Sequence, residues 1–556
     1  MYLFGGTSLF SFLFIFRSLL PAGSPLVAHT PASEYPDLYE ASIKDLQNGL
    51  DRGEFTSVDL VKAYFARVNE VNFKGPRLRA VIETNPQALG QAAELDAERK
   101  KTGKRSPLHG IPILLKDNIA TLASEGMNTT AGSYALLKSI VPGDATVAAK
   151  LRAAGAILLG KANLSEWANM RGTFLPTSGW SGRGGQATNP YYPGADPCGS
   201  SSGSGVAIAV GLAAGSLGTE TDGSIMCPAS YNNIVGIKPT VGLTSRAGVI
   251  PISSHQDSVG PMARSVADAA AILSIIAGRD SQDNYTWTAP TIIPEYTQFL
   301  DVNAIKGKRF GVPRAVFTDD SITGNHPSIN IEFDKSLETI RSMGGIVVDP
   351  ADLPSADEIL NTQEMIIFET DLKIDLNKYL RGLKFIPTGA GTLEKIIEFN
   401  NKYKNLEQPK GYEGQSVFIA AEATSGYGSA YYDALRKDYE MGRQRGIDAA
   451  LEAHNLDALL LPTNGITPAP AAIAGYPIVT VPLGFHPNDT PVGRAGPNTV
   501  FPAPGIPFGL SFLGTAYSEP ALIGFAYAYE QRTHARLKRL AYKEAIPKTQ
   551  IQDVID

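Results

Sequence analysis

The sequence predicts an α/β protein, because apolar runs of strand length alternate with segments of helical periodicity along its 556 residues. Residues 111–115 form an apolar run that is too short for a helix and is bounded by Gly110 and Asp117, which is typical of a buried strand. Residues 145–154 then show a helical pattern, and residues 156–159 predict the next strand. The same alternation returns in the second half of the chain, with strands expected at residues 309–312 and 346–348 and a helix at residues 329–343.

Two helices are predicted at the start of the folded domain, near residue 35. The first helix stops at Gly53, because glycine readily ends a helix. Thr56 and Asp59 have the spacing of a capping box, which predicts that a second helix begins there. The apolar residues that indicate the first helix by their spacing are Ile43, Leu46 and Leu50.

One large domain over residues 35–545 is the simplest interpretation, because the chain shows no internal repeat and no strong linker. Within this domain, residues 350–440 are predicted to be mostly helical. The stretch from His486 to Pro507 is rich in proline and glycine, and it predicts a long surface loop.

The first 28 residues have the features of a signal peptide. An apolar run from Leu9 to Phe16 precedes Pro21 and several small residues, and it is too short to span a bilayer unaided. We therefore expect a secreted protein, without stable membrane insertion once the leader is removed. Because Arg17 interrupts the run and no positive charge precedes it, a membrane tether or a cytoplasmic protein without a functional leader is the alternative. Glycosylation sequons that are compatible with secretion begin at Asn128, Asn163, Asn284 and Asn488.

Charge and composition argue against nucleic acid and metal as partners. The net charge of -6 is spread over the whole chain, and no run of Lys and Arg could follow a phosphate backbone. The seven histidines are scattered, and no Cys/His cluster has the spacing of a zinc site. Only two cysteines are present, Cys198 and Cys227, and we expect two free buried thiols, with a bridge as the alternative. The sequence assigns no oligomeric state.

The least ordinary segment runs from Cys198 to Ser230, where glycine and serine crowd two short loops. Between them, the small residues 206–214 predict a helix that lies deep in the protein, because small side chains let backbones approach closely. The two serine clusters can then meet in space. In the second loop, the backbone N–H groups of residues 221–224 can converge on one point, as an oxyanion hole requires. Taken alone, such a stretch is more often a turn or a flexible loop.

Several separated segments of the chain resemble the amidase signature family. Residues 198–204 read CGSSSGS where the family has GGSSGGS, and residues 218–226 read GTETDGSIM where the family has GTDTGGSIR. Residues 109–118, HGIPILLKDN, match the segment that supplies the family's catalytic lysine, and the similarity continues over residues 236–268. The resemblance implies the family's fold, which is a large, mixed, twisted β-sheet covered by helices on both faces.

The resemblance also implies an amide hydrolase with a Ser-cisSer-Lys triad and an acyl-enzyme intermediate. Ser224 would attack the amide carbonyl, Ser200, 24 residues earlier as in the family, would relay its proton, and Lys116 would act as the base. The base must be neutral, and burial among apolar residues lowers a lysine pKa. Asp117 should point away from Lys116, because side chains alternate along a strand. No cofactor is required. The implied oxyanion and substrate contacts are Thr221, Asp222, Gly223 and Ser201.

Some positions depart from the family pattern. The departures are Cys198, Ser202 and Asp222 in place of glycine, Glu220 in place of Asp, and Met226 in place of Arg. A negative side chain at Asp222 must point away from the oxyanion or contact the substrate. Together with residues 163–172 and 178–190, the GTETDGSI variant is similar to the peptide amidase branch, whose members remove a C-terminal carboxamide from peptides. Trp167 or Trp180 would then line a pocket, or would be buried structural residues.

Three other interpretations compete with this one. Ser201 lies at the centre of a G-x-S-x-G pattern, as in an α/β-hydrolase esterase, but no strand is predicted before it. Its histidine partner would have to be an isolated residue such as His454 or His534. Residues 155–161 spell most of a phosphate-binding loop, but Ala162 stands where Ser or Thr is required. A partner-dependent amidotransferase subunit of the transamidosome shares the fold and would need no secretion signal.

Overall fold

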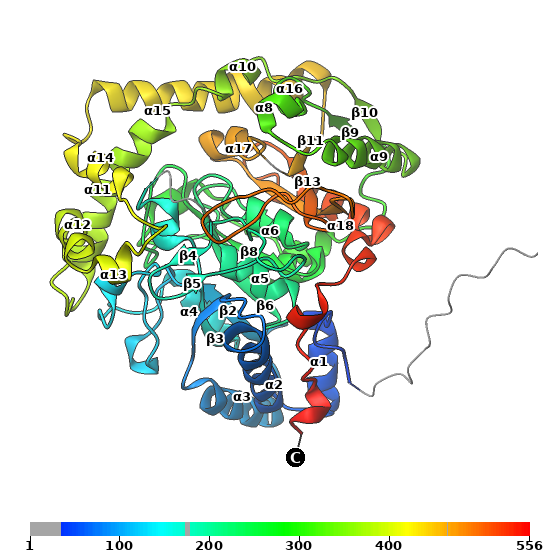
Figure 1. The fold of residues 1–556 in the computed structure, drawn as a ribbon. Coiled ribbons are helices and arrows are strands. Elements are labelled where there is room, and N and C mark those ends of the chain that lie inside the picture. Colours follow the sequence, from blue (N-terminus) through cyan, green and yellow to red (C-terminus); the bar gives the residue numbers. More distant parts are fainter. Residues whose placement is uncertain (1–34, 173–177, 464, 556) are drawn as a thin grey trace, which may run out of the picture. The chain divides into compact units, whose positions relative to one another are not determined.

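The computed structural model describes residues 35–172, 178–463 and 465–555, so the predicted leader lies outside the described residues. Within these ranges, eleven strands form one mixed sheet in the order β1-β3-β2-β6-β8-β7-β12-β13-β11-β9-β10 (Figure 1). The strands are β1 (Val81–Thr84), β2 (Pro112–Lys116), β3 (Ile157–Ala162), β6 (Gly215–Glu220), β7 (Val235–Lys238), β8 (Ser258–Ala263), β9 (Arg309–Gly311), β10 (Ile346–Val348), β11 (Ala458–Thr463), β12 (Ile478–Phe485) and β13 (Pro507–Leu513), with β4 (Trp180–Ser181) and β5 (Gly185–Gln186) in a separate pair.

Helices from distant parts of the chain pack against this sheet. Close contacts join α6 to β12 and β13, α7 to β8, and α18 to β12. The α/β class predicted from the sequence is confirmed. The α-helices outside residues 350–440 are α1 (Ile43–Arg52), α2 (Ser57–Val68), α3 (Ala88–Thr102), α4 (Thr146–Ala153), α5 (Ser202–Ala209), α6 (Met226–Tyr231), α7 (Val266–Ile276), α8 (Asp320–Thr323), α9 (Ser328–Ser342), α16 (Asp448–His454), α17 (Ala469–Ala474) and α18 (Glu519–Thr533).

The strand that carries the predicted base lies inside the sheet, third from one edge. β2 pairs in parallel with β3 on one side and with β6 on the other, and all five of its residues are buried. A fully buried parallel strand requires apolar side chains on both faces, which explains the unbroken run of residues 111–115. As predicted, this strand ends at Lys116. The other predicted elements are also present, as α4, β3, β9, α9 and β10.

The two predicted N-terminal helices are confirmed together with their boundaries. α1 ends at Gly53, which adopts a left-handed conformation with φ of 70°. α2 begins after Thr56, whose hydroxyl accepts from the backbone N–H of Asp59 while the Asp59 carboxylate accepts from the backbone of Thr56. The two reciprocal bonds satisfy N–H groups that a helix start otherwise leaves unpaired.

The helix predicted at residues 206–214 was placed wrongly, because α5 begins at Ser202 and ends at Ala209. Its first turn consists of glycine and serine, which have low helix propensity, and tertiary packing overrides that preference. A side chain at Gly203 would meet the carbonyl oxygen of Ala80 at 2.2 Å, so only glycine fits this part of the helix. The helix stops early because Gly211 takes a left-handed conformation with φ of 67°.

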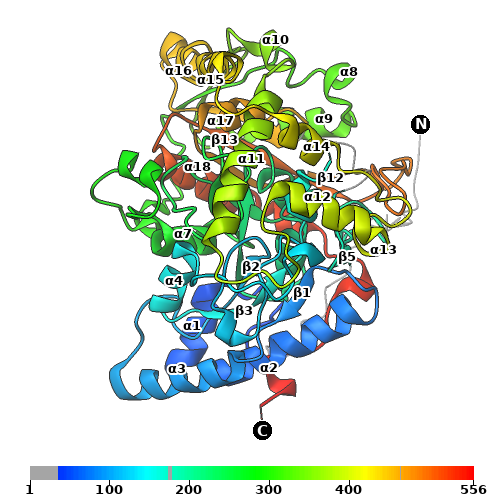
Figure 2. The same cartoon turned by 90° about the vertical axis from the view of Figure 1, so that its left-hand side faces the viewer.

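A mainly helical segment covers one side of the sheet, where the sequence predicted helices over residues 350–440. Figure 2 shows α11, α12 and α14 in front of the central strands, and α11 also contacts α15. The helices of this segment are α10 (Ala356–Ile359), α11 (Glu364–Gly382), α12 (Leu393–Lys402), α13 (Lys404–Glu407), α14 (Ser416–Ala423) and α15 (Ser429–Gly442).

The connection between β12 and β13 contains neither helix nor strand over residues 486–506, all of which are described. Many of its residues are exposed, but Ala503 and Ile506 are buried and form a small apolar cluster with Ala195. Val500 of this connection forms a strand-like backbone bridge with Ala195. Ala195 precedes the glycine- and serine-rich segment by a few residues.

Candidate active site

Lys116 reaches the glycine- and serine-rich segment from the end of β2. Its ammonium group Nζ donates to Ser200 Oγ at 2.8 Å and to the hydroxyl and carbonyl oxygens of Thr219 at 2.8 and 3.0 Å. Asn118 also donates to the Thr219 hydroxyl, at 3.0 Å. Lys116 and Ser200 are fully buried, so this contact is shielded from bulk water. The sequence did not indicate the roles of Thr219 and Asn118 as partners of the lysine.

Burial sets the protonation behaviour of Lys116. It lowers the pKa of the ammonium group to about 7, although the carboxylates of Asp257 and Glu220 oppose this effect. Near neutral pH, a substantial fraction of the protein therefore carries a neutral amine at Lys116. A neutral amine can accept a proton from the hydroxyl that it contacts.

The carboxyl group next to this lysine in the sequence faces other partners, as strand alternation predicts. Asp117 accepts from the hydroxyl of Thr130 at 2.5 Å and from the backbone N–H of Gly132 at 2.9 Å, and Arg183 lies 3.7 Å away. Asp117 is thus held in its own polar network, away from the Lys116 contacts.

The two predicted serine segments meet directly. The backbone N–H of Ser201 donates to the carbonyl oxygen of Ser224 at 3.1 Å, and the Gly199–Ser200 peptide bond is cis. The Ser201 hydroxyl donates to the carbonyl of Thr219 at 3.1 Å. Ser201 therefore holds the Ser200 segment against β6 and against Ser224, and its hydroxyl faces a strand rather than the opening of an esterase-type nucleophile turn.

The segment around Ser224 forms the loop between β6 and α6. Ser224 is 7% exposed, Asp222 is exposed, and Thr221 is buried with its hydroxyl donating to the Asp257 carboxylate at 2.6 Å. Within the described part of the chain, the backbone N–H groups of Asp222 and Ser224 donate to no protein acceptor. Free N–H groups beside a serine hydroxyl are suited to bind a negatively charged oxygen.

Glu220, which stands where the resembling family has Asp, fixes the far end of this loop. Its carboxylate accepts from the backbone N–H groups of Ile225 and Met226, at 2.6 and 2.9 Å, at the start of α6. Burial raises the pKa of Glu220, and the nearby Lys238 ammonium and the amides of the loop oppose that rise. The longer glutamate side chain thus caps α6 while Ser224 stays between the strand and the helix.

Cys198 and Cys227 form a disulfide bond, so the expectation of two free thiols was wrong. Their Cα atoms are 5.8 Å apart although 29 residues separate them in the chain. The two segments are brought together by the path of α5 and β6, which lie between the two cysteines. The sequence could not reveal this proximity without the correct course of α5.

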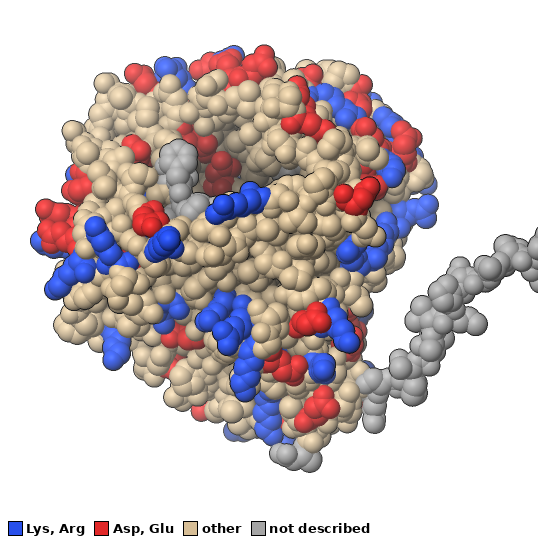
Figure 3. Space-filling view, in the orientation of Figure 1, with Lys and Arg blue, Asp and Glu red and all other residues tan. Residues whose placement is uncertain are grey.

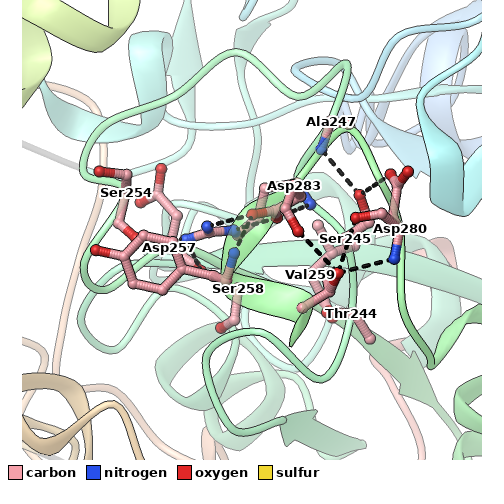
Figure 4. Close-up of polar contacts among 12 residues, drawn as sticks. Thr244, Ser245, Ala247, Ser254, Asp257, Ser258, Val259, Asp280 and Asp283 are labelled. Carbon is pink, nitrogen blue, oxygen red and sulfur yellow. Dashed lines mark hydrogen bonds and ion pairs between the residues drawn. The ribbon is translucent and has the colours of Figure 1, made fainter. Parts of the chain in front are cut away.

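Asp257 connects the Thr221 contact to a second polar network, drawn in Figure 4. The Asp257 carboxylate also accepts from the backbone N–H groups of Ile252 and Ser253, and burial raises its pKa to about 6. The neighbouring cation is Arg246, which is paired with Asp283 at 2.7 Å. A cavity of about 400 Å³ lies between this network and α11. No sequence motif predicted a role for Asp257.

The surface of the folded part of the chain, from residue 35 onwards, has a hollow on one face. Figure 3 shows acidic side chains in its depth, and comparison with Figure 1 places it beside α17. Pro468, the residue before α17, lies next to Gly223 of the Ser224 loop. The exposed residue of that loop is Asp222.

The two tryptophans considered as pocket residues are packed against neighbours. Trp167 lies edge to face with Phe418, with ring centres 5.5 Å apart. Trp180 stacks on Tyr412 at 4.6 Å and also carries the guanidinium of Arg171 at 4.9 Å. Both indole rings are buried.

The remaining motifs have structural roles. Lys161, the last residue of the apparent phosphate-binding loop, lies in β3 and donates to the backbone carbonyl of Ile119. His454 ends α16 and His534 follows α18, far along the chain from any serine of the site.

In the described ranges, no group of three or more His, Cys, Asp or Glu side chains is arranged to hold a metal ion. Of the helices that can be described, none combines the length and the apolar character needed to cross a bilayer.

Comparisons with known proteins identify the family of the chain. The sequence profile of the amidase family matches residues 59–523. The peptide amidase of Stenotrophomonas maltophilia is 43% identical, with a TM-score of 0.80 over 92% of this chain and 99% of that one. An amidase family protein of Bacillus anthracis is 32% identical, with the same TM-score over 92% and 93%. A glutamyl-tRNA(Gln) amidotransferase subunit from Geobacter metallireducens is 34% identical over 507 residues, covering 89% of this chain and 98% of that protein.

The family match over most of the chain and the shared fold define an amide-hydrolysing enzyme. The chain belongs to the amidase family, also known as the amidase signature family. The resemblance seen in the separated sequence motifs is confirmed, and so is the enzyme class.

Proposed function

We propose that Ser224 is the nucleophile, Ser200 the proton relay and Lys116 the general base of an amide hydrolase. The observation that carries this proposal is the buried contact of 2.8 Å between Lys116 Nζ and Ser200 Oγ, with a lysine pKa of about 7. The neutral amine takes the Ser200 proton while Ser200 takes the Ser224 proton. The Ser224 oxygen then bonds to the amide carbon and a tetrahedral intermediate forms.

The intermediate carries its negative charge on the former carbonyl oxygen. In our proposal, backbone N–H groups of residues 221–224 bind this oxygen, and such a donor typically contributes about 3 kcal/mol to transition-state stability. The proton held by Lys116 returns through Ser200 to the departing nitrogen, and the C–N bond breaks. Water then attacks the acyl-enzyme through the same relay, which releases the carboxylic acid and restores the hydroxyl of Ser224.

We further propose that the substrate is a peptide with a C-terminal carboxamide and that the products are the peptide acid and ammonia. This is supported by the 43% identity to a peptide amidase along nearly the whole of both chains and by the GTETDGSI motif. The test is a panel of peptide amides, aryl anilides and fatty acyl amides, with the Ser224→Ala variant as the blank. We expect the highest kcat/KM on peptide amides. A preference for another class would reject the substrate, and an active Ser224→Ala variant would reject the mechanism.

A partner-dependent amidotransferase subunit is the second candidate, because of the 34% identity to a glutamyl-tRNA(Gln) amidotransferase protein. The identity to this protein is lower than that to the peptide amidase. Hydrolysis of a simple amide by the purified single chain would exclude a strict requirement for a partner.

We also propose that the protein enters the secretory pathway. A disulfide between the only two cysteines is the arrangement expected in an oxidising compartment, and two of the sequon asparagines, Asn284 and Asn488, are exposed. Expression of the full-length chain in a eukaryotic host, followed by N-terminal sequencing of the medium fraction, tests this proposal. A chain that stays in the cytosol with residue 1 intact would reject it.

A further inference from the structure

The disulfide joins the two segments that carry the site serines. Cys198 is separated from Ser200 only by Gly199, and Cys227 lies three residues after Ser224, in the first turn of α6. The covalent bond thus spans the same gap as the hydrogen bond between the Ser201 N–H and the Ser224 carbonyl. Any change in the distance between these cysteines changes the distance between the two serine segments.

The Cys198 side of the bond has little freedom of its own. The Cys198 N–H donates to the Asp196 carboxylate at 2.7 Å, and its carbonyl accepts from the Ser202 hydroxyl at 2.5 Å. Gly199 has no room for a side chain, because a Cβ atom would meet the Ser165 hydroxyl oxygen at 2.3 Å. A displacement of Cys198 is therefore passed on to Ser200 rather than absorbed in between.

The chain between Ser224 and Cys227 is also short and held by hydrogen bonds. The Cys227 N–H donates to the carbonyl of Gly223 at 2.8 Å, which closes the loop around Ser224. Glu220 holds the start of α6 through Ile225 and Met226, but these bonds run to β6 and not to the Ser200 segment. A side-chain bond from Asn232 to the carbonyl of Pro197, at 2.8 Å, is a further link between α6 and the chain before Cys198. Hydrogen bonds alone therefore keep the two segments near each other, but with less restraint.

The disulfide lies where solvent can reach it. Both cysteines are only partly buried, and the exposed Asp222 belongs to the same loop as Ser224. A small reductant can reach the sulfur atoms from the solvent. The chain has two cysteines in all, so a reductant acts on this bond and on no other disulfide.

We propose that the Cys198–Cys227 disulfide is a positioning element of the active site, which holds Ser200 and Ser224 at the separation that proton relay requires. This inference rests on the proposed roles of the two serines. Reduction adds two electrons and two protons and leaves two thiols, with the added reductant as the electron donor. The reduced enzyme keeps its fold and its substrate-binding surfaces but loses alignment at the reacting atoms. A misplacement on the order of 1 Å typically lowers a rate about 100-fold.

The test compares oxidised and reduced forms of the full chain on one peptide amide. Free thiols are first counted with a thiol reagent under native and denaturing conditions, and steady-state kinetics are then measured with and without tris(2-carboxyethyl)phosphine. We expect no free thiol before reduction and two after it, kcat lower by about 10- to 100-fold, and KM changed by less than about 2-fold. The pH at which activity is half-maximal should stay unchanged, because the pKa of Lys116 is lowered by its burial at the end of β2 and not by its contact with Ser200. Removal of the reductant and reoxidation should restore kcat.

Two variants control for the reagent. The Cys198→Ser/Cys227→Ser and Cys198→Ala/Cys227→Ala double variants should match the reduced enzyme in kcat and should not respond to the reductant. Circular dichroism and thermal unfolding show whether each form is folded at the assay temperature. A reduced enzyme and double variants that keep kcat within 2-fold would overturn the proposal, and so would two free thiols in the active enzyme as purified.

Two further outcomes distinguish failure of the disulfide proposal from failure of the proposed mechanism. If the reduced form and both double variants are unfolded at the assay temperature, the bond is required for the fold and the positioning role is rejected. If the oxidised Ser224→Ala variant is as active as the parent, the proposed mechanism fails, whatever reduction does. The ratio of oxidised to reduced kcat in the parent enzyme therefore tests the disulfide, and the Ser224→Ala variant tests the serine.

Discussion

Lys116 Nζ lies 2.8 Å from Ser200 Oγ at the end of a fully buried strand. The strand places the amine among apolar neighbours, and the resulting loss of hydration favours the neutral form. The hydroxyl and carbonyl of Thr219 hold the amine in place. Both groups are neutral, whereas a carboxylate at this position would favour the protonated form of the lysine. The geometry thus supplies an oriented base, and a substantial fraction of it is uncharged near neutral pH.

Replacing Lys116 by arginine tests whether this residue must accept a proton or only donate a hydrogen bond. The Lys116→Arg variant keeps a hydrogen-bond donor at the end of β2, but a guanidinium stays protonated at all working pH values and cannot accept a proton. We expect kcat/KM on a peptide amide to fall by roughly 10²- to 10⁴-fold. Lys161→Arg is the matched control, because Lys161 is also buried but contacts no serine. Equal losses in the two variants would point to a packing effect.

The pH profile should report the protonation of Lys116. A base with a pKa of about 7 is inactive when protonated, so kcat/KM should rise through about pH 7 and level off above it. The Asp257 carboxylate raises this pKa, so the Asp257→Asn variant should move the acid limb to lower pH. An acid limb that stays in place in this variant would show that another group controls it.

Glu220 should contribute to stability through its cap on α6. The Glu220→Ala variant leaves the buried N–H groups of Ile225 and Met226 without an acceptor, and each such group costs about 1–3 kcal/mol. We expect the free energy of unfolding in urea to fall by roughly 2 kcal/mol or more. Glu220→Gln keeps an acceptor oxygen and should lose less. If both variants unfold like the parent, the cap has no energetic importance.

Burial predicts which sequons can be glycosylated in a secreted protein. Asn163 is fully buried and donates to the carbonyls of Arg79 and Gly185, so it cannot carry a glycan in the folded chain. Asn284 and Asn488 are exposed. Mass spectrometry of protein secreted from a eukaryotic host should find glycans at Asn284 or Asn488 and none at Asn163. A glycan at Asn163 would contradict the fold around β3.

Much of the fold could be predicted, because its strands and helices follow local patterns. The buried run that ends at Lys116 and the capping box at Thr56 each depend on a few neighbouring residues. The start of α5 could not be predicted in this way, since glycine and serine are helical there only because neighbouring backbone, such as the Ala80 carbonyl, excludes larger side chains. At this point tertiary packing, and not local helix propensity, determines where the helix begins.

The same limit applies to the site. The sequence motifs predict Lys116, Ser200 and Ser224 as site residues, but Asp257 belongs to a segment that carries only a resemblance to the family. Its bond to Thr221 joins residues 36 apart in the chain. The disulfide was missed for a related reason, since the approach of Cys198 and Cys227 depends on the path of everything between them.

The most direct test of the account is to identify the residue that carries the acyl group. The enzyme is mixed with an activated ester or an aryl anilide, quenched in acid during turnover, digested and analysed by tandem mass spectrometry. We expect one acyl group per chain, on Ser224, and none in the Ser224→Ala variant. An acyl group on Ser200 or Ser201, or an acyl group retained in the Ser224→Ala variant, would contradict the mechanism.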